Sequence, residues 1–169
     1  MKILKYTAFA ICIILVLGLF IPEKITIPVQ GASSNDWNHD TFWYEPWGTS
    51  GVHKGIDIFG IKNTHVVAAT SGIVVFAGKF GKGGNVVAVL GPRWRIHYFA
   101  HLDSYSVSSG YFVKMNSKIG ELGDTGNATG KQPHVHYSIF SLVPVPWFAT
   151  LERQGWKKIF FLNPHEKLQ

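Results

Sequence analysis

The stretch VVAATSGIVVFAGKFGKGGNVVAVLGPRWRIHYFAHL occupies residues 66–102. Its runs of Val, Ile, Phe and Ala are short and are separated by glycine, proline and asparagine, a pattern typical of strands joined by tight turns. Two further runs of this kind, YFVKMNSKIGEL and HVHYSIF, begin at Tyr111 and His134. The pattern predicts an all-β, β-rich fold: a single compact antiparallel sheet or sandwich domain, with turn-rich joints at residues 81–85 and 123–130.

The composition is consistent with one folded domain. The chain has 169 residues, of which 46% are hydrophobic and 14% aromatic, which is too apolar for a disordered protein and enough for a sizeable core. Residues 141–169 contain the aromatic segments VPWF and GWKKIFFLNP. We expect a loop and a short terminal strand there that close the domain.

The N-terminus has the features of an export segment. Lys2 and Lys5 precede an uncharged apolar run at residues 6–22, whose length lies between that of a cleaved signal and that of a membrane span. A cleaved signal peptide and an N-terminal membrane anchor both stay open, with a buried core helix as a third interpretation. The small residues of Val29-Gln30-Gly31 before Ala32 favour cleavage there. In the first two cases the two lysines keep the N-terminus in the cytoplasm, so we expect the domain in the periplasm or cell envelope.

The rest of the chain follows this segment without an internal repeat. We predict an aromatic lead-in at residues 32–47, ASSNDWNHDTFWYEPW, and the folded domain at residues 48–169. The single cysteine, Cys12, lies in the apolar run, so the exported part has no disulfide.

The net charge bears on the binding partners. It is +6 for the whole chain and about +4 without residues 1–31. Such an excess suits an anionic extracellular polymer, although ordinary solubility charge explains it equally well. Nucleic acid is excluded as a partner because the sequence has no Lys/Arg cluster or basic helix.

Histidine clustering points to a metal site. Four of the eight histidines fall in three compact motifs, HKGID at 53–57, FAHL at 99–102 and HVH at 134–136. A fully extended chain would separate His53 from Asp57 by about 13 Å, so the backbone should bend between them, at Gly55. Alternate strand residues share a face, so His134 and His136 can reach one pocket. Two imidazoles and a carboxylate match the ligand set of a hydrolytic zinc site.

Each motif alone has a simpler explanation. An HxH pair in a strand is more often surface or core histidine than metal ligand, and HKGID alone could be a turn with an exposed charge pair. Only their joint occurrence favours a metal. We take His39, His65 and His165 as surface residues. His97 shares an expected strand face with His101 and could line the same groove, but we expect it to be exposed.

These motifs carry a family resemblance. The segments HKGIDIFG, VVAATSGIVVFAG, GGNVVAVLGP, FAHLD and GELGDTGNATGKQPHVH resemble, in order, those of the lysostaphin-type, LytM-like zinc endopeptidases that cut peptidoglycan peptides. The resemblance extends over roughly residues 46–167. It implies an antiparallel sheet open to a loop-walled groove, one Zn²⁺ per chain and a peptidoglycan peptide as substrate, cut in the stem or the cross-bridge. It also implies the site residues, which are His53, Asp57 and His136 as zinc ligands and His101 and His134 as catalytic residues.

The sequence departs from the family pattern at two places. Phe99 stands where the family usually has Tyr, and Val135 and Tyr137 stand where it has Leu and Phe. Both changes leave the implied ligand set intact, so we expect them to affect rate or specificity. We expect a monomer.

Two other classes of protein compete with the enzyme. One is a non-catalytic LytM-like adaptor that activates cell-wall amidases, as in relatives that have lost ligands; here all five positions are filled. The other is a lipoyl- or biotinyl-type carrier, because GIVVFAGK and YFVKMNSKIGEL resemble its strands. Lys114 is not at an obvious hairpin tip, however, and a carrier has no use for the histidines.

The residues also constrain the mechanism. The sequence has no HExxH helix to supply a glutamate base, so His101 and His134 are the candidates for proton transfer. If His134 and His136 both joined His53 and Asp57 on the metal, four protein ligands would leave no position for water. One of the pair must therefore stand off the metal, and the family pattern assigns that role to His134. The aromatic segments FWYEPW and VPWF and the glycines of residues 123–130 are expected to wall the groove.

Overall fold

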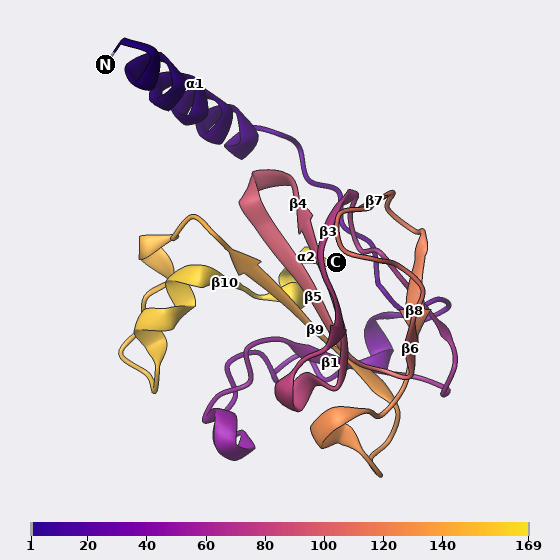
Figure 1. The fold of residues 1–169 in the computed structure, drawn as a ribbon. Coiled ribbons are helices and arrows are strands. Elements are labelled where there is room, and N and C mark those ends of the chain that lie inside the picture. Colours follow the sequence, from indigo (N-terminus) through magenta and orange to yellow (C-terminus); the bar gives the residue numbers. More distant parts are fainter. Residues whose placement is uncertain (1, 169) are drawn as a thin grey trace.

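The computed structural model describes residues 2–168. Residues 1 and 169, where the predicted export segment begins and the predicted domain ends, lie outside the described residues. Its strands form two antiparallel sheets (Figure 1). The large sheet has the order β1-β9-β5-β4-β3-β7, and β10 pairs with β9 beyond the end of β1. The small sheet has the order β2-β8-β6. The large sheet consists of β1 (Ile56–Phe59), β3 (Gly72–Lys79), β4 (Asn85–Gly91), β5 (Arg95–Leu102), β7 (Phe112–Val113), β9 (His134–Ser141) and β10 (Phe161–Leu162), and the small sheet of β2 (His65–Val67), β6 (Ser104–Tyr105) and β8 (Lys118–Glu121).

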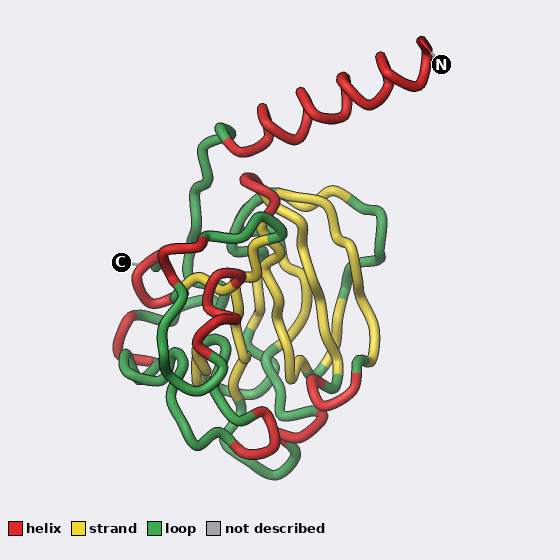
Figure 2. The backbone as a smooth tube through the Cα atoms, turned by 90° about the vertical axis from the view of Figure 1, so that its left-hand side faces the viewer, coloured by secondary structure: helices red, strands yellow, loops and turns green. Residues whose placement is uncertain are grey.

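This architecture confirms the all-β prediction, and the alternation of strand residues determines where the core lies. One face of the large sheet and the inner face of the small sheet contribute to a single apolar cluster, in which Ile58, Val87 and Tyr137 meet Val66 and Ile119. The small sheet lies to one side of the large sheet in Figure 1, and Figure 2 shows the long strands side by side. Since successive side chains point to opposite faces, the next residue on each central strand faces away from this core. That second face carries the candidate site.

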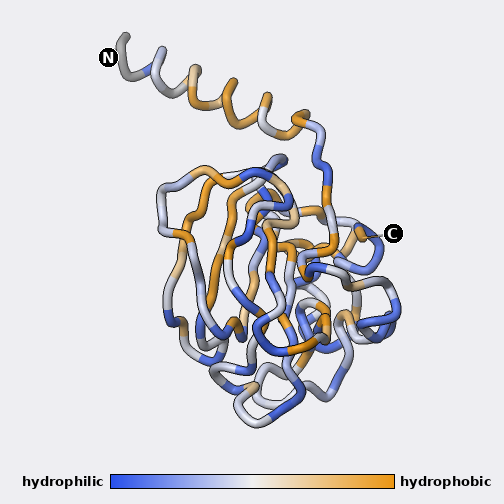
Figure 3. Tube along the Cα trace, turned by 90° about the vertical axis from the view of Figure 1, so that its right-hand side faces the viewer, coloured by the Kyte–Doolittle hydropathy of each residue, from blue (hydrophilic) through white to orange (hydrophobic). Residues whose placement is uncertain are grey.

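The helices lie at the ends of the chain and between strands. The long helix α1 (Lys2–Leu19) projects away from the sheets as a largely apolar rod (Figure 3). It meets the domain where the indole N–H of Trp94 donates to the carbonyl of Leu15 at 2.8 Å. Among residues 2–168, no helix combines the length and the apolarity needed to cross a bilayer.

The C-terminal part has the expected loop and short strand. Two 3₁₀ helices, η6 (Pro146–Phe148) and η7 (Gly155–Phe160), precede β10, and a short helix α2 (Pro164–Lys167) follows it. Residues 142–160 lie on the opposite side of the large sheet from the small sheet (Figure 1). They therefore border the face that carries the candidate site.

Candidate metal centre

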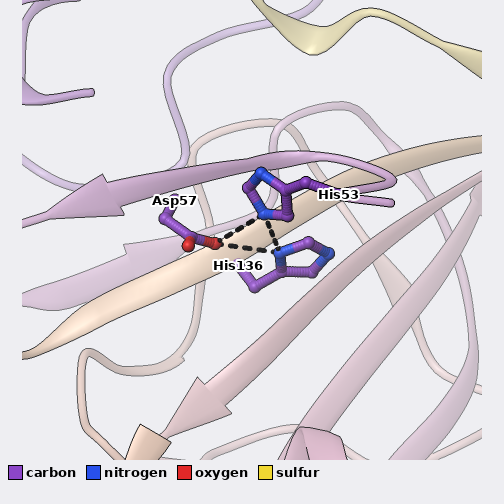
Figure 4. A group of neighbouring side chains, drawn as sticks. All are labelled: His53, Asp57 and His136. Carbon is purple, nitrogen blue, oxygen red and sulfur yellow. Dashed lines mark hydrogen bonds and ion pairs between the residues drawn. The ribbon is translucent and has the colours of Figure 1, made fainter. Parts of the chain in front are cut away.

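Three predicted side chains converge on one point. His53 comes from the loop before β1, Asp57 from β1 and His136 from β9, where Asp57 and His136 are register partners. The Nε2 atom of His53 lies 3.1 Å from Oδ1 of Asp57 and 3.0 Å from Nδ1 of His136, and the last two atoms are 2.9 Å apart (Figure 4). The structure thus brings together the HKGID and HVH motifs, which are about 80 residues apart in the sequence.

Outer hydrogen bonds orient both imidazoles toward this point. The Nδ1–H of His53 donates to the carbonyl of Thr41 at 3.0 Å, which leaves Nε2 as the lone-pair nitrogen. The hydroxyl of Ser138 donates to the carbonyl of Lys54 at 2.5 Å, so its oxygen accepts from Nε2–H of His136 at 3.1 Å. The lone pair of His136 is then on Nδ1. These networks assign the tautomers that a metal ligand requires.

The close approach of the HKGID loop to β9 depends on Gly55. A Cβ atom at this position would lie 2.4 Å from the carbonyl oxygen of Tyr137 and 2.6 Å from Oγ of Ser138. No side chain fits at such distances, so glycine allows the loop to pack directly against the strand. The chain between His53 and Asp57 is bent as predicted, but Gly55 serves close packing at this point.

The three donors fit a small divalent cation. Ligands 2.0–2.1 Å from a tetrahedral ion are about 3.3–3.4 Å from one another, so the observed separations need only a slight widening. Burial alone would raise the pKa of Asp57, but its close contacts with the imidazoles of His136 and His53 hold this pKa well below its usual range. The carboxylate is therefore ionised at neutral pH. Within residues 2–168, no other group of His, Cys, Asp and Glu side chains could hold a metal ion.

His101 and His134 stand beside this cluster and outside it. Their ring centroids are 5.1 Å apart, and the ring of His101 lies 6.3 Å from that of His136. The Nδ1–H of His101 donates to the carbonyl of Thr125 at 2.9 Å, and that of His134 to the carbonyl of Gln132 at 2.7 Å. Each ring therefore keeps Nε2 as a proton acceptor. Burial and the neighbouring imidazoles lower the pKa of His101 to about 4, so this histidine is neutral at physiological pH.

The backbone of His101 breaks the strand alternation. Its φ of 65° lies in the left-handed region, which a non-glycine residue rarely adopts outside functional or strained positions. This turn directs the ring toward His134, whereas regular alternation would have placed it on the core face with His97 and Phe99.

The prediction that His97 is exposed, with the groove as its alternative position, is wrong. His97 is 0% exposed and its Nδ1 accepts a hydrogen bond from the hydroxyl of Tyr137 at 2.7 Å, on the core face of the sheet. His39 and His65 are exposed as expected. The prediction for His165 is also wrong in part, because it is half-buried and its Nδ1 accepts from the indole N–H of Trp37 at 3.2 Å.

Hollows lie on either side of the metal cluster. One, of about 730 Å³, is lined on the sheet by Tyr98, His136 and Ser138 and is mostly apolar in character. The other, of about 450 Å³, reaches Asp57 and Phe59. Both include Trp47, whose ring stacks on His53 at 4.0 Å between centroids. Of the two aromatic segments predicted to wall the groove, FWYEPW therefore does so through Trp47. Trp147 and Phe148 of VPWF line a different hollow, and Phe140 and Phe161 line the large one.

The sequence comparisons agree with this geometry. The profile of peptidase family M23 matches residues 51–144, more than half of the chain. The chain belongs to peptidase family M23. In the structure these residues include β1 through β9 and all five predicted site positions.

The curated relatives of this M23 chain include peptidases and activators. It is 36% identical over 86 residues to the DD-carboxypeptidase/endopeptidase Mpg of Neisseria meningitidis serogroup B strain MC58, which covers 51% of the chain and 19% of Mpg. It is 35% identical over 89 residues to lysostaphin of Staphylococcus simulans (52% and 18%) and 34% identical over 97 residues to the murein hydrolase activator NlpD of Escherichia coli (56% and 25%). The matches thus span a quarter or less of each of these relatives.

Solved structures show the same M23 fold. The catalytic domain of lysostaphin from Staphylococcus simulans has a TM-score of 0.53 at 35% identity, over 56% of this chain and 72% of that one. A protein from Ruminococcus gnavus described as a putative glycyl-glycine endopeptidase has a TM-score of 0.63 at 25% identity, over 86% and 59% of the two chains.

The departures from the M23 pattern include one neighbouring pair. Phe99 on β5 and Tyr137 on β9 are register partners, and their rings stack at 5.3 Å between centroids. Both side chains are fully buried. The family pattern has Tyr at the position of Phe99 and Phe at the position of Tyr137. In this chain the one hydroxyl of the pair is therefore on β9 instead of β5. That hydroxyl is the one that donates to His97.

Sequence reasoning missed the residues that orient the imidazoles. Ser138 follows His136 by two residues, so the HxHxS alternation already places it on the face of the two histidines. The sequence pattern therefore indicated that Ser138 lies beside the histidines. Thr41 contributes a backbone carbonyl from the lead-in segment, and no side-chain pattern could have indicated it.

Proposed function

We propose that this protein is a zinc-dependent metalloendopeptidase that hydrolyses peptide bonds in bacterial peptidoglycan. The observation that carries the proposal is the convergence of Nε2 of His53, Oδ1 of Asp57 and Nδ1 of His136, with their lone pairs oriented by outer hydrogen bonds. The similarity to the DD-carboxypeptidase/endopeptidase Mpg and to lysostaphin, whose solved structure is described as that of an antimicrobial peptidase, supports the same class of reaction.

The three protein ligands leave one coordination position of a tetrahedral ion open. Three protein ligands suit a catalytic zinc site, in which the fourth position is open. Zinc at such a site polarises a carbonyl and lowers the pKa of water from 15.7 to about 7. His53, Asp57 and His136 would hold the ion, and the hollows on either side give a peptide access to it.

His101 and His134 are the proposed catalytic residues. His101 is neutral at physiological pH because its pKa is about 4, so Nε2 can accept the proton that the attacking water loses. His101 can then return this proton to the leaving amine, and His134 beside it, once its Nε2 carries a proton, can donate to the developing oxyanion. The hydrogen bonds to the Thr125 and Gln132 carbonyls hold both rings in the required tautomer.

We infer that an extended peptide lies along the two hollows beside the metal cluster. Trp47 forms a wall over His53, and Tyr98 and Phe140 form part of the floor of the larger hollow. We propose a peptide of the peptidoglycan stem or cross-bridge as the substrate, with the protein exported through its N-terminal apolar run at residues 6–22 and acting as a monomer outside the cytoplasmic membrane. Activity found only in a cytosolic fraction, with residues 1–31 retained, would overturn this location.

The similarity to NlpD favours a second candidate, an adaptor that activates cell-wall amidases. Metal analysis and digestion separate the two. We expect about one zinc per purified chain and new peptide termini, identified by mass spectrometry, when purified peptidoglycan is digested. Protein that contains no zinc, leaves peptidoglycan intact and stimulates an added amidase would instead establish the adaptor. The position of the new termini would also show whether the stem or the cross-bridge is cut.

A further inference from the structure

The segment that follows α1 is packed into the domain. We call residues 23–31 the strap. Its backbone runs along the edge of β2, where the amide of Thr26 donates to the carbonyl of Ala69 at 2.9 Å and the amide of Val67 donates to the carbonyl of Pro28 at 2.8 Å. Val29 pairs with Val66, is 3% exposed and belongs to the main apolar cluster. The strap therefore completes the small sheet and part of the core.

A buried carboxylate ties the start of the strap to the large sheet. The side chain of Glu23 is 4% exposed and forms ion pairs with Arg95 and His97 of β5. Its Oε1 accepts from Nε2–H of His97 at 3.1 Å, while Nδ1 of His97 accepts from the hydroxyl of Tyr137 at 2.7 Å. Glu23 is thus linked through His97 to Tyr137 of β9, which lies between the two site residues His136 and Ser138 in the sequence.

The link between α1 and the strap has few contacts. Residues 20–22 are exposed, and α1 itself meets the domain around Trp94, whose indole N–H donates to the carbonyl of Leu15 and whose ring lies against Gly18. Loss of α1 would therefore cost the domain little. A cut between Gly31 and Ala32 would remove Val29 from the core and leave Arg95 and His97 without the acceptor that they share.

We propose that residues 23–31 belong to the folded, functional domain, and that Glu23 is a positioning residue that holds β5 and β9 through Arg95 and His97. Any processing that removes α1 then cuts before Glu23, within the exposed residues 20–22. This site differs from the one before Ala32 that the small residues of the sequence favoured. The proposal concerns the extent of the domain and does not depend on the proposed enzyme activity.

The N-terminus of the native protein tests the proposal directly. The full chain is expressed in a host that exports it, recovered from the envelope and medium, and analysed by intact mass and N-terminal peptide mass spectrometry. An N-terminus at or before Glu23, including the unprocessed chain, is the expected result. A folded protein that begins anywhere from residue 24 onward, Ala32 included, would overturn the proposal.

Substitutions in the full chain test the role of Glu23. Glu23→Ala leaves Arg95 and His97 buried without their carboxylate, so we expect the Tm to fall by about 5–10 °C. Lys24→Ala is the matched control, because Lys24 is the next residue of the strap and its side chain is exposed; its Tm should change by about 1 °C or less. Glu23→Gln keeps an oxygen that accepts from His97 and should recover part of the loss.

Equal melting temperatures for Glu23→Ala and Lys24→Ala, or no recovery in Glu23→Gln, would contradict the positioning role. If Glu23→Ala does not fold, the comparison of Glu23→Gln with Lys24→Ala and the N-terminus of the unmodified protein still decide the question. None of these measurements uses peptidoglycan hydrolysis, so failure of this proposal and failure of the enzyme assignment are distinguishable.

Discussion

Replacement of Ser138 tests whether the outer hydrogen bonds matter for metal binding. Ser138→Ala removes the oxygen that accepts from Nε2–H of His136 at 3.1 Å and the hydroxyl that donates to the carbonyl of Lys54 at 2.5 Å. His136 then loses the interaction that keeps its lone pair on Nδ1. Loss of such an outer partner typically weakens metal binding 10- to 100-fold. Ser138 lines the larger hollow, so water can replace part of the bond, and we expect the lower end, about tenfold or about 1.4 kcal/mol.

The zinc Kd is measured by competition with a chromophoric chelator at fixed pH, and Ser141→Ala is the matched control. Ser141 lies on the same strand, is also buried, and donates its hydroxyl hydrogen bond to the carbonyl of Val143 at 2.6 Å, away from the cluster. Its replacement should lower the Tm without changing the zinc Kd. An unchanged Kd in Ser138→Ala, or the same loss in both variants, would refute the reasoning.

Three other outcomes are expected. His101→Ala should keep its zinc and lose about 100-fold or more in hydrolysis rate, because it removes a proton acceptor and no ligand; a metal-free variant would reverse that assignment. The pKa of His101, about 4, is below its ordinary value of 6.5, so this base stays neutral from pH 7 to pH 5; the loss of activity in acid should follow protonation of the ligands and move to lower pH as buffered free zinc is raised. If the pH at which activity is lost does not change with free zinc concentration, this explanation is wrong. Gly55→Ala should lower the Tm by about 5 °C or more, since its Cβ would lie 2.4 Å from a carbonyl of β9, whereas Gly78→Ala, whose Cβ meets only the ring of Phe76 at 3.4 Å, should not.

Local patterns in the sequence were sufficient to predict the strands, whereas the joining of the HKGID and HVH motifs in one metal cluster was implied by the family resemblance. The apolar runs between turn residues become β3, β4, β5 and β9, and the alternation of HVH places both histidines on one face, opposite the core. The meeting of His53 with Asp57 required a bend, which the sequence placed at Gly55, but the close packing of Gly55 against β9 was not predicted. Apart from the family resemblance, each of these inferences depends on residues that are adjacent or nearly adjacent in the sequence.

Long-range contacts account for what the sequence did not predict. Alternation alone puts His97 and His101 on one face, but the left-handed backbone at His101 separates them, and nothing in the local sequence requires that conformation. The burial of His97 depends on Glu23, 74 residues away, in a segment whose composition resembles a signal cleavage region. In the same way, the carbonyl of Thr41 becomes a partner of His53 only after the lead-in segment has folded over the site.

The central claim is that His134 and His136, two residues apart on β9, do different work. His136 directs Nδ1 at Asp57 and His53, whereas His134 stands beside His101 with its Nδ1 bonded to Gln132. The most direct test is zinc content and peptidoglycan hydrolysis measured together in His134→Ala and His136→Ala. We predict that His134→Ala keeps about one zinc per chain and loses most activity, by about 100- to 10,000-fold, while His136→Ala loses both. Zinc lost from His134→Ala and retained in His136→Ala would contradict the account.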